Sequence, residues 1–213
     1  MDAQFWHQKW KDNEIGFHEA DYNPGLTRHF HGLGLPKGSR ILVPLCGKTR
    51  DIHWLLTQGY KVVGAELSEL AVKQLFEALD YSPAVEDTDL GKTYTAPGIQ
   101  VFVGDIFSVT SHHTGRIDGI YDRAALVALP YEVRIRYAQH LMNLTQQAPQ
   151  LLITFDYDQS QMDGPPFSVP AEEVKSLYRA SYALDCVQDS NIDGGLKSVD
   201  SARINVWLLK SAD

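Results

Sequence analysis

The sequence is poor in cysteine and in long hydrophobic runs. Cys46 and Cys186 are the only cysteines among 213 residues, and neither belongs to a CxxC pair or a Cys/His cluster. A disulfide scaffold and a zinc site of the usual spacing are therefore not expected. No apolar run approaches the roughly 18–20 residues of a membrane span, and the first residues show no apolar stretch behind a basic one. We therefore expect a cytoplasmic protein without membrane association.

Positive charge is also scarce. Lysine and arginine together number 19 against 27 acidic residues, which gives a formal net charge of −8. Nucleic-acid binding needs a cationic face that releases counterions from phosphates, so we expect no nucleic-acid partner. A small anionic substrate stays compatible, because its pocket needs only one or two local cations. Hydrophobic residues make up 44% of the chain, which is enough for a buried core and excludes a disordered chain.

Repeats, low-complexity tracts and Gly/Ser-rich linkers are absent too, so we predict one domain over residues 1–213. Short β-branched apolar runs alternate with segments of helical periodicity, which is typical of a mainly parallel sheet with helices on both faces. The predicted strands cover residues 40–47, 61–66, 99–105, 117–122, 151–155, 183–189 and 202–210. The predicted helices cover residues 51–56, 68–79, 131–146 and 171–182. Because no helical segment separates the last two strands, they are expected to pair as an antiparallel hairpin at one edge.

Charged residues follow the carboxyl ends of the predicted strands, where ligands bind in α/β sheets of this kind. Glu66 ends the second strand, 19 positions after Gly47 in the first turn. A carboxylate about 20 residues after the first turn is where the ribose hydroxyls of a nucleotide are held. On spacing alone, an exposed acid at a strand end explains Glu66 equally well.

The first turn lacks the G-x-G-x-x-G fingerprint of dinucleotide sites. It reads P-L-C-G-K at residues 44–48, with a single glycine. Close approach of a pyrophosphate depends on the missing glycines, so the turn disfavours a dinucleotide. A nucleoside ligand without phosphates needs less room, and S-adenosylmethionine is such a ligand. Asp105, which ends the third strand, is then a candidate for contacting the adenine edge.

Several longer segments combine into a family pattern. They are residues 5–10 with 15–18, 43–48, 63–68, 120–128 and 164–170. In this order they resemble the thiopurine S-methyltransferases, particularly the bacterial members, and the likeness covers nearly the whole chain. The P-L-C-G-K turn in place of a glycine-rich one is itself a mark of that family.

The resemblance implies a fold and a co-substrate. The fold is α/β, the Rossmann-like fold of class I methyltransferases, with a mostly parallel seven-stranded sheet and helices on both faces. The sheet core would occupy residues 39–213, and residues 1–38 would form a short N-terminal helical cover. The implied co-substrate is S-adenosyl-L-methionine.

The resemblance also assigns cofactor contacts to residues of this sequence. Trp10 and Leu45 match cofactor contacts, and Glu66 matches the ribose ligand that the spacing also predicts. Asp105 and Ile106 lie where the family brackets the adenine, although the residue type at position 105 varies.

Arg123 matches an arginine at the cofactor and substrate site, and we expect it to be the catalytic residue. The implied reaction is transfer of a methyl group to the sulfur of a thiopurine or another aromatic or heterocyclic thiol. Thiopurine sulfur ionises near neutral pH, so a strong general base is not required. A fixed guanidinium can stabilise the thiolate or orient a water molecule that accepts the proton.

Aromatic side chains are the candidates for the acceptor pocket. Phe17 and Phe167 offer flat apolar surfaces that suit an aromatic substrate. Phe167 follows a Gly-Pro-Pro sequence, for which a packed turn, with a cis peptide bond, is an equally good interpretation. Trp6 stays undecided, because Trp6 and Trp10 are also neighbours on one helical face.

Other polar residues receive no site assignment. The eight histidines lack the spacing of a metal site, so we predict no metal. Residues 191–203 depart from the family pattern, in which some members carry a second arginine near the acceptor. Lys197 and Arg203 are the cations available there, and neither aligns with that arginine.

Three rival functions remain open. Bacterial relatives are associated with selenium and tellurium methylation, so chalcogen detoxification, including tellurite resistance, is the principal alternative role. A nucleotide-dependent oxidoreductase and a non-catalytic adenosyl-binding module are less favoured. No heptad pattern or exposed apolar helix indicates a protein partner, so we expect a monomer that acts on a small thiol.

Overall fold

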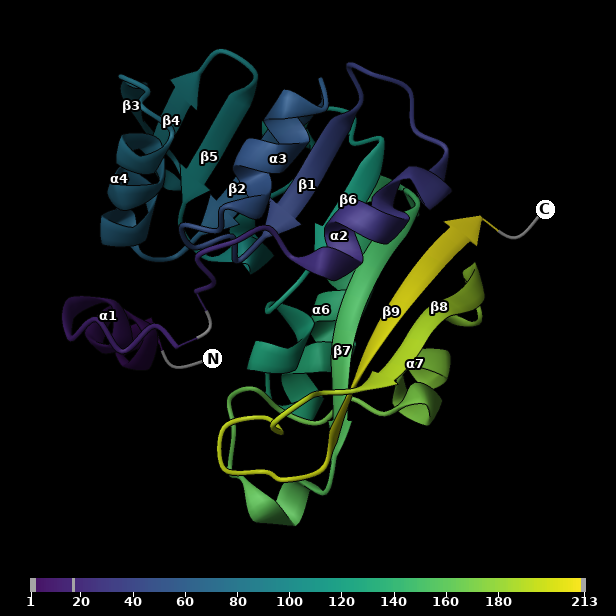
Figure 1. Cartoon of the computed structure of the whole chain (residues 1–213). Coiled ribbons are helices and arrows are strands. Elements are labelled where there is room, and N and C mark those ends of the chain that lie inside the picture. The colour runs from purple at the N-terminus through teal and green to yellow at the C-terminus, as the bar shows by residue number, and fades with distance from the viewer. Residues whose placement is uncertain (1–2, 17, 212–213) are drawn as a thin grey trace. The chain divides into compact units, whose positions relative to one another are not determined.

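The computed structural model describes residues 3–16 and 18–211, which divide into two compact units (Figure 1). We call residues 3–16, 18–27 and 35–118 the N-terminal unit, and residues 28–34 and 119–211 the C-terminal unit. Each unit has its own strands and covering helices. The single-domain organisation expected from the sequence stays a prediction.

The N-terminal unit is built on five strands. Their order is β3-β4-β5-β2-β1, and β1, β2 and β5 are parallel whereas β3, β4 and β5 pair antiparallel. The strands are β1 (Arg40–Pro44), β2 (Lys61–Glu66), β3 (Ala84–Thr88), β4 (Gly91–Ala96) and β5 (Ile99–Val103). The helices are α1 (Ala3–Lys11), α3 (Asp51–Thr57), α4 (Glu69–Ala78), α5 (Ser111–Thr114) and the 3-10 helix η2 (Ile106–Ser108).

Burial explains why the parallel strands form. Four of the five residues of β1 and five of the six residues of β2 are buried, as expected for strands covered on both faces. Helices α3 and α4 pack against β2 on the face turned toward the viewer in Figure 1. Helix α4 begins after Ser68, whose hydroxyl caps it by accepting a hydrogen bond from the Ala71 N–H.

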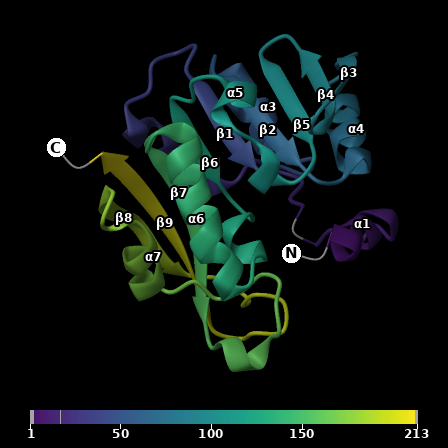
Figure 2. The same ribbon diagram turned by 180° about the vertical axis from the view of Figure 1, so that it is seen from behind.

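The C-terminal unit is built on four strands in the order β6-β7-β9-β8. The strands are β6 (Gly119–Asp122), β7 (Gln150–Tyr157), β8 (Tyr182–Asn191) and β9 (Ala202–Ser211). Its helices are η1 (Phe30–Leu33), η3 (Leu126–Ala128), α6 (Tyr131–Thr145), η4 (Gln159–Gln161) and α7 (Ala171–Tyr178), while α2 (Pro24–His29) spans the boundary between the two sets of residues. Figure 2 shows α6 and α7 on the near face of these strands, and η1 packs on β7 and β9. Strands β8 and β9 pair antiparallel, which confirms the predicted closing hairpin.

The α/β class is confirmed, but the seven-stranded sheet needs a correction. The described residues contain nine strands, and β3 and β4 were not predicted. All five residues of β3 are exposed, so the strand has no buried apolar face from which the sequence could reveal it. It forms because β4 pairs with β5 and a short turn brings β3 back along β4.

Candidate functional site

The turn after β1 has an unusual main-chain conformation. Leu45 and Gly47 both have positive φ angles, 46° and 49°. A leucine in this region is uncommon, and such conformations gather at ligand sites. The Cys46 N–H donates to the Ala65 carbonyl oxygen at 3.2 Å, so the turn is held against the end of β2.

Glu66, the last residue of β2, is fixed by this turn. Its Oε2 accepts from the Gly47 N–H and its Oε1 accepts from the Ser68 N–H, both at 2.8 Å. The side chain is only 6% exposed, and burial raises its pKa although the N–H donors act in the opposite direction. Each oxygen keeps a further lone pair, so the carboxylate can accept hydrogen bonds from a vicinal diol.

Trp10 packs on the same turn from α1. A Cβ atom added to Gly47 would lie 3.0 Å from Cζ2 of the Trp10 ring. The Trp10 side chain is buried, and α1 lies beside α4 within the N-terminal unit. Trp10, the β1 turn and Glu66 are therefore neighbours.

The end of β5 brings Asp105 and Ile106 to the same edge. Strand β5 runs parallel to β2, and the Gly104 N–H donates to the Glu66 carbonyl oxygen at 2.9 Å. Asp105 is exposed and its Oδ1 accepts from the Phe107 N–H at 3.0 Å, which starts η2. The Ile106 side chain is buried in the core, so this residue offers a ligand its main chain.

Cys46 lies inside the turn but is not equipped as a nucleophile. Its side chain is buried, and its Sγ would lie 3.0 Å from a Cβ atom added to Gly64. Burial and the charge of Glu66 raise the pKa of the thiol. A protonated, buried thiol is unreactive.

Arg123 belongs to the C-terminal unit and follows β6 directly. It is half-buried, and the next residue, Ala124, has a φ of 59°. The Asp122 carboxylate crosses this turn, because its Oδ1 accepts from the Leu126 N–H at 3.0 Å. Arg123 therefore stands on a tightly held turn.

Phe167 is tied to the segment that follows Arg123. Its N–H donates to the Val127 carbonyl oxygen at 2.6 Å, and the Arg134 guanidinium lies 5.9 Å from the centre of its ring. The peptide bonds before Pro165 and Pro166 are both cis, as considered for this loop. Phe17, the other predicted substrate residue, lies outside the described residues.

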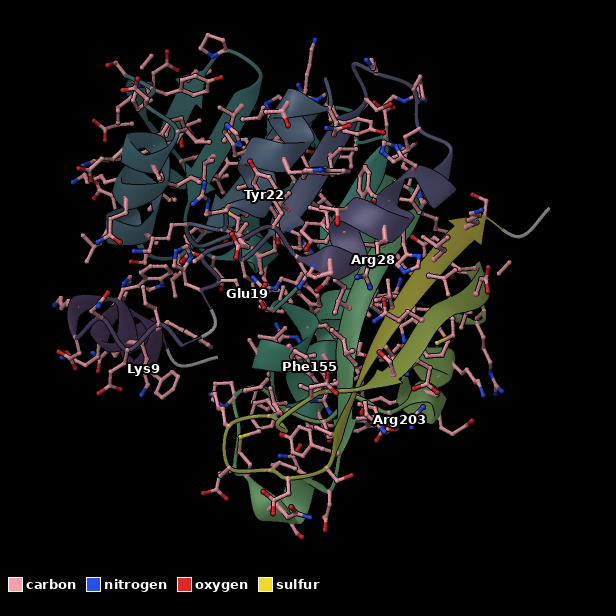
Figure 3. All side chains as sticks on the ribbon, in the orientation of Figure 1. Lys9, Glu19, Tyr22, Arg28, Phe155 and Arg203 are labelled. Carbon is pink, nitrogen blue, oxygen red and sulfur yellow. The ribbon has the colours of Figure 1, made fainter. Side chains whose placement is uncertain are left out.

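The two cations of residues 191–203 have structural partners. Lys197 donates from Nζ to the Pro165 carbonyl oxygen at 2.7 Å, and so supports the loop that carries Phe167. Arg203, labelled in Figure 3, donates to Asp189 at 2.7 Å and to Asn191 at 3.2 Å across the β8–β9 hairpin. These contacts bind the segment to its own unit.

Most predicted cofactor residues thus gather at one edge of the N-terminal unit, whereas Arg123 and Phe167 share the C-terminal unit. Within residues 3–16 and 18–211, no group of three or more His, Cys, Asp and Glu side chains is arranged to hold a metal ion. Among the helices of those residues, none is long and apolar enough to cross a membrane.

Sequence reasoning assigned no role to two charged residues in the C-terminal unit. Asp122 lies at the end of a buried strand, and that position was the available signal. Arg134 lies in a helix of mixed polarity and gave no signal, because its partner Glu173 is 39 positions away.

Comparison with known proteins gives consistent results. The model of the family described as "Thiopurine S-methyltransferase (TPMT)" matches residues 1–211. A thiopurine S-methyltransferase of Teredinibacter turnerae is 51% identical over 209 residues, which cover 98% of this chain and 97% of that protein. A thiopurine S-methyltransferase of Xanthobacter autotrophicus is 49% identical over 213 residues, and the match covers 100% of both chains.

A solved structure shows the fold. The 1,6-didemethyltoxoflavin-N1-methyltransferase of Burkholderia thailandensis, with bound 1,6-didemethyltoxoflavin and S-adenosylhomocysteine, superposes with a TM-score of 0.68 at 15% identity. The match covers 98% of this chain and 87% of that one. The fold is that of the class I S-adenosylmethionine-dependent methyltransferases, and with the family match over nearly every residue, the chain belongs to the thiopurine S-methyltransferase family.

Proposed function

We propose that this protein transfers the methyl group of S-adenosylmethionine to the sulfur of thiopurines and other aromatic or heterocyclic thiols, leaving S-adenosylhomocysteine. The observation that carries the proposal is the Glu66 carboxylate, which two N–H groups orient beside a turn with a single glycine. This arrangement suits the ribose of a nucleoside and leaves out the pyrophosphate cradle of a dinucleotide. The names of the 49–51% identical relatives support the choice of acceptor.

The proposed cofactor residues have complementary tasks. The second lone pairs of the Glu66 carboxylate accept hydrogen bonds from the two ribose hydroxyls. Trp10 and Leu45 provide apolar surface beside the turn, and Asp105 with the main chain of Ile106 contacts the adenine. S-adenosylmethionine, when bound, supplies the electrophilic methyl group of its sulfonium.

Arg123 is the proposed catalytic residue on the acceptor side. A guanidinium stays protonated at physiological pH, so Arg123 stabilises the acceptor thiolate and does not serve as its base. The proton of a neutral thiol passes to water. Transfer brings a cation and an anion together and neutralises both, so orientation and partial exclusion of water contribute most of the acceleration. Phe17 and Phe167 are the proposed acceptor walls.

A transfer assay with radiolabelled S-adenosylmethionine tests the proposal. We expect methylation of 6-mercaptopurine, and the Arg123→Ala variant should lose about 100-fold or more in kcat/KM, which is the range for removal of a positioned charge. The free energy of unfolding of that variant in urea should decrease far less, in proportion, than its transfer rate, so that the variant stays folded under assay conditions. Arg179→Ala, which removes an exposed arginine of the same unit, is the matched control and should keep normal transfer.

The same assay separates the rival functions. Transfer to selenite or tellurite without transfer to any thiol would replace the thiol acceptor by a chalcogen one. Calorimetric binding of NAD without binding of S-adenosylhomocysteine would favour an oxidoreductase. Binding of S-adenosylhomocysteine without turnover on any acceptor would favour a non-catalytic module. We further propose a cytoplasmic monomer without a nucleic-acid or membrane partner.

A further inference from the structure

Asp122 is a fully buried carboxylate for which the proposed function has no use. It ends β6, has 0% of its surface exposed, and lies next to Arg123 in the sequence. Its Oδ1 accepts from the Leu126 N–H at 3.0 Å and its Oδ2 accepts from the Tyr137 hydroxyl at 2.8 Å. Burial of a carboxylate costs folding free energy unless such donors surround it, so a role for this side chain is expected.

The first hydrogen bond closes the turn that carries Arg123. Arg123 and Ala124 lie between Asp122 and Leu126, and the φ of 59° at Ala124 is unfavourable for any residue with a Cβ atom. The Asp122–Leu126 bond spans this left-handed turn and fixes the start of η3. The Ala128 N–H then donates to the Ala125 carbonyl oxygen at 3.0 Å, which continues η3. The main chain is therefore held on both sides of Arg123.

The second hydrogen bond fixes the carboxylate itself. Tyr137 comes from the middle of α6, and its side chain is fully buried. Its hydroxyl holds one oxygen of Asp122, which leaves the other oxygen directed at the Leu126 N–H. A residue 15 positions further along the chain, in α6, thus holds the side chain that spans the turn at Arg123.

We propose that Asp122, oriented by Tyr137, is a positioning residue that sets the direction in which Arg123 leaves its turn and thereby determines the transfer rate. The inference rests on the proposed function, because it acts through the catalytic role of Arg123. Neither Asp122 nor Tyr137 contacts the acceptor in this scheme. Their effect must therefore disappear when the Arg123 side chain is removed.

A double-mutant cycle tests this dependence. Tyr137→Phe removes one hydroxyl from a buried position and leaves the ring in place. We expect it to lower kcat/KM for 6-mercaptopurine about tenfold in the unmodified protein and by less than about twofold in the Arg123→Ala background. The dissociation constant of S-adenosylhomocysteine, measured by calorimetry, should change less than kcat/KM, because Trp10, Leu45 and Glu66 supply cofactor contacts that do not depend on the direction of Arg123.

Tyr182→Phe is the matched control. It also removes a buried tyrosine hydroxyl of the C-terminal unit, one that donates to the Ala148 carbonyl oxygen at 3.1 Å. It should lower stability by a similar amount and leave kcat/KM unchanged. Equal rate losses in Tyr137→Phe and Tyr182→Phe, or equal losses from Tyr137→Phe with and without the Arg123 side chain, would overturn the inference.

Substitutions of Asp122 complete the test. Asp122→Ala should lose rate as Tyr137→Phe does, whereas Asp122→Asn, which keeps an acceptor for the Leu126 N–H, should recover part of that loss. If Asp122→Ala does not fold, the kcat/KM values of Asp122→Asn and Tyr137→Phe still test whether Asp122 positions Arg123. A normal rate in Tyr137→Phe together with a strong loss in Arg123→Ala would refute the positioning role and leave the proposed function standing. Absence of transfer by the unmodified protein would refute both.

Discussion

Gly47 satisfies two independent requirements at a single position. Its φ of 49° favours glycine, and the Trp10 ring leaves a Cβ atom only 3.0 Å of room. Its N–H also holds one oxygen of Glu66. Gly47 therefore adopts the conformation of the turn, leaves room for the Trp10 ring and orients Glu66, the proposed partner of the ribose.

We predict that Gly47→Ala weakens cofactor binding more than its effect on stability explains. The added methyl group should displace Trp10 and the turn, and so raise the dissociation constant of S-adenosylhomocysteine about tenfold or more. The left-handed alanine should also cost about 1–2 kcal/mol of unfolding free energy. Calorimetry and urea denaturation measure the two effects.

Gly38→Ala is the control that separates the effect of main-chain strain from the effect of the contact with Trp10. Gly38 has a φ of 87° and no atom within 4 Å of an added Cβ atom. This variant should lose stability and keep its affinity for S-adenosylhomocysteine. Unchanged affinity in Gly47→Ala would contradict the proposed place of the cofactor.

Single residues also show how far a sequence can be interpreted. Glu66 was predictable because strand length and crossover length fix its spacing from the first turn. The N–H groups that orient it were not, since they depend on the φ angles of Leu45 and Gly47. Asp122 was visible at a strand end, but its importance depends on Tyr137, a residue of another element.

At the scale of elements, one buried ion pair joins α6 to α7. Arg134 donates from Nε and Nη2 to the two oxygens of Glu173, at 2.6 Å and 3.0 Å. Its Nη1 donates to the Leu129 carbonyl oxygen at 3.0 Å, just beyond η3. The Phe167 ring lies beside the same guanidinium, so this pair supports the loop on the proposed acceptor side.

We predict that Glu173→Gln is strongly destabilising. It leaves the buried Arg134 charge without its counter-charge, which typically costs about 3–5 kcal/mol. Urea denaturation measures the loss. Replacing both partners by apolar residues, Arg134→Met with Glu173→Leu, should cost less than the single change.

The neighbouring residue on α7 is the control. Glu172 pairs with Lys175, but its side chain is 84% exposed, and surface pairs contribute little. Glu172→Gln should change stability by less than about 1 kcal/mol. Similar losses of unfolding free energy at positions 172 and 173 would show that the Arg134–Glu173 pair stabilises the protein no more than a surface pair.

Elements with a buried face were predictable and exposed ones were not. Helix α6 was expected at residues 131–146 and spans Tyr131–Thr145, because its apolar spacing follows its buried side. The β3–β4 hairpin depends on pairing with β5, a relation that no local pattern of its own residues expresses.

For the whole molecule, two carboxylates give stability opposite dependences on pH. Burial raises the pKa of Asp122 from 3.8 to about 6, and the donors Leu126, Tyr137 and Ala125 only partly offset it. The groups that face it include Tyr137 of α6 and Tyr178 of α7.

Glu69 is the second carboxylate, and its pKa is lowered to about 2 by hydrogen bonds from Tyr94, Lys92 and Lys73. Its contribution is present above its ordinary pKa and is lost as the pH falls.

We predict that Asp122 makes the opposite contribution to the free energy of unfolding, one that is largest at low pH. The folded protein holds the Asp122 proton more tightly than the unfolded chain, so stability decreases as the pH rises from about 4 to about 6 and then levels off. The full change is on the order of 3 kcal/mol, at about 1.4 kcal/mol for each pH unit.

Comparison of the unmodified protein with Asp122→Asn isolates this effect. Subtracting the two curves of unfolding free energy against pH removes Glu69, which titrates in both proteins. The difference should fall between pH 4 and pH 6 and stay flat above pH 7. A flat difference over the whole range would mean that Asp122 titrates as an ordinary carboxylate.

The acidic side chains of the outermost strands have a consequence for solubility. Strands β3 and β8 each stand at the end of the strand order of their unit. Such edges expose main-chain groups that can pair with another molecule and start aggregation. Strand β3 carries Glu86 and Asp87, and β8 carries Asp185 in addition to Asp189, which is paired with Arg203. Negative charge at both edges opposes the approach of a second copy, so part of the net charge of −8 protects the folded protein from edge-to-edge association.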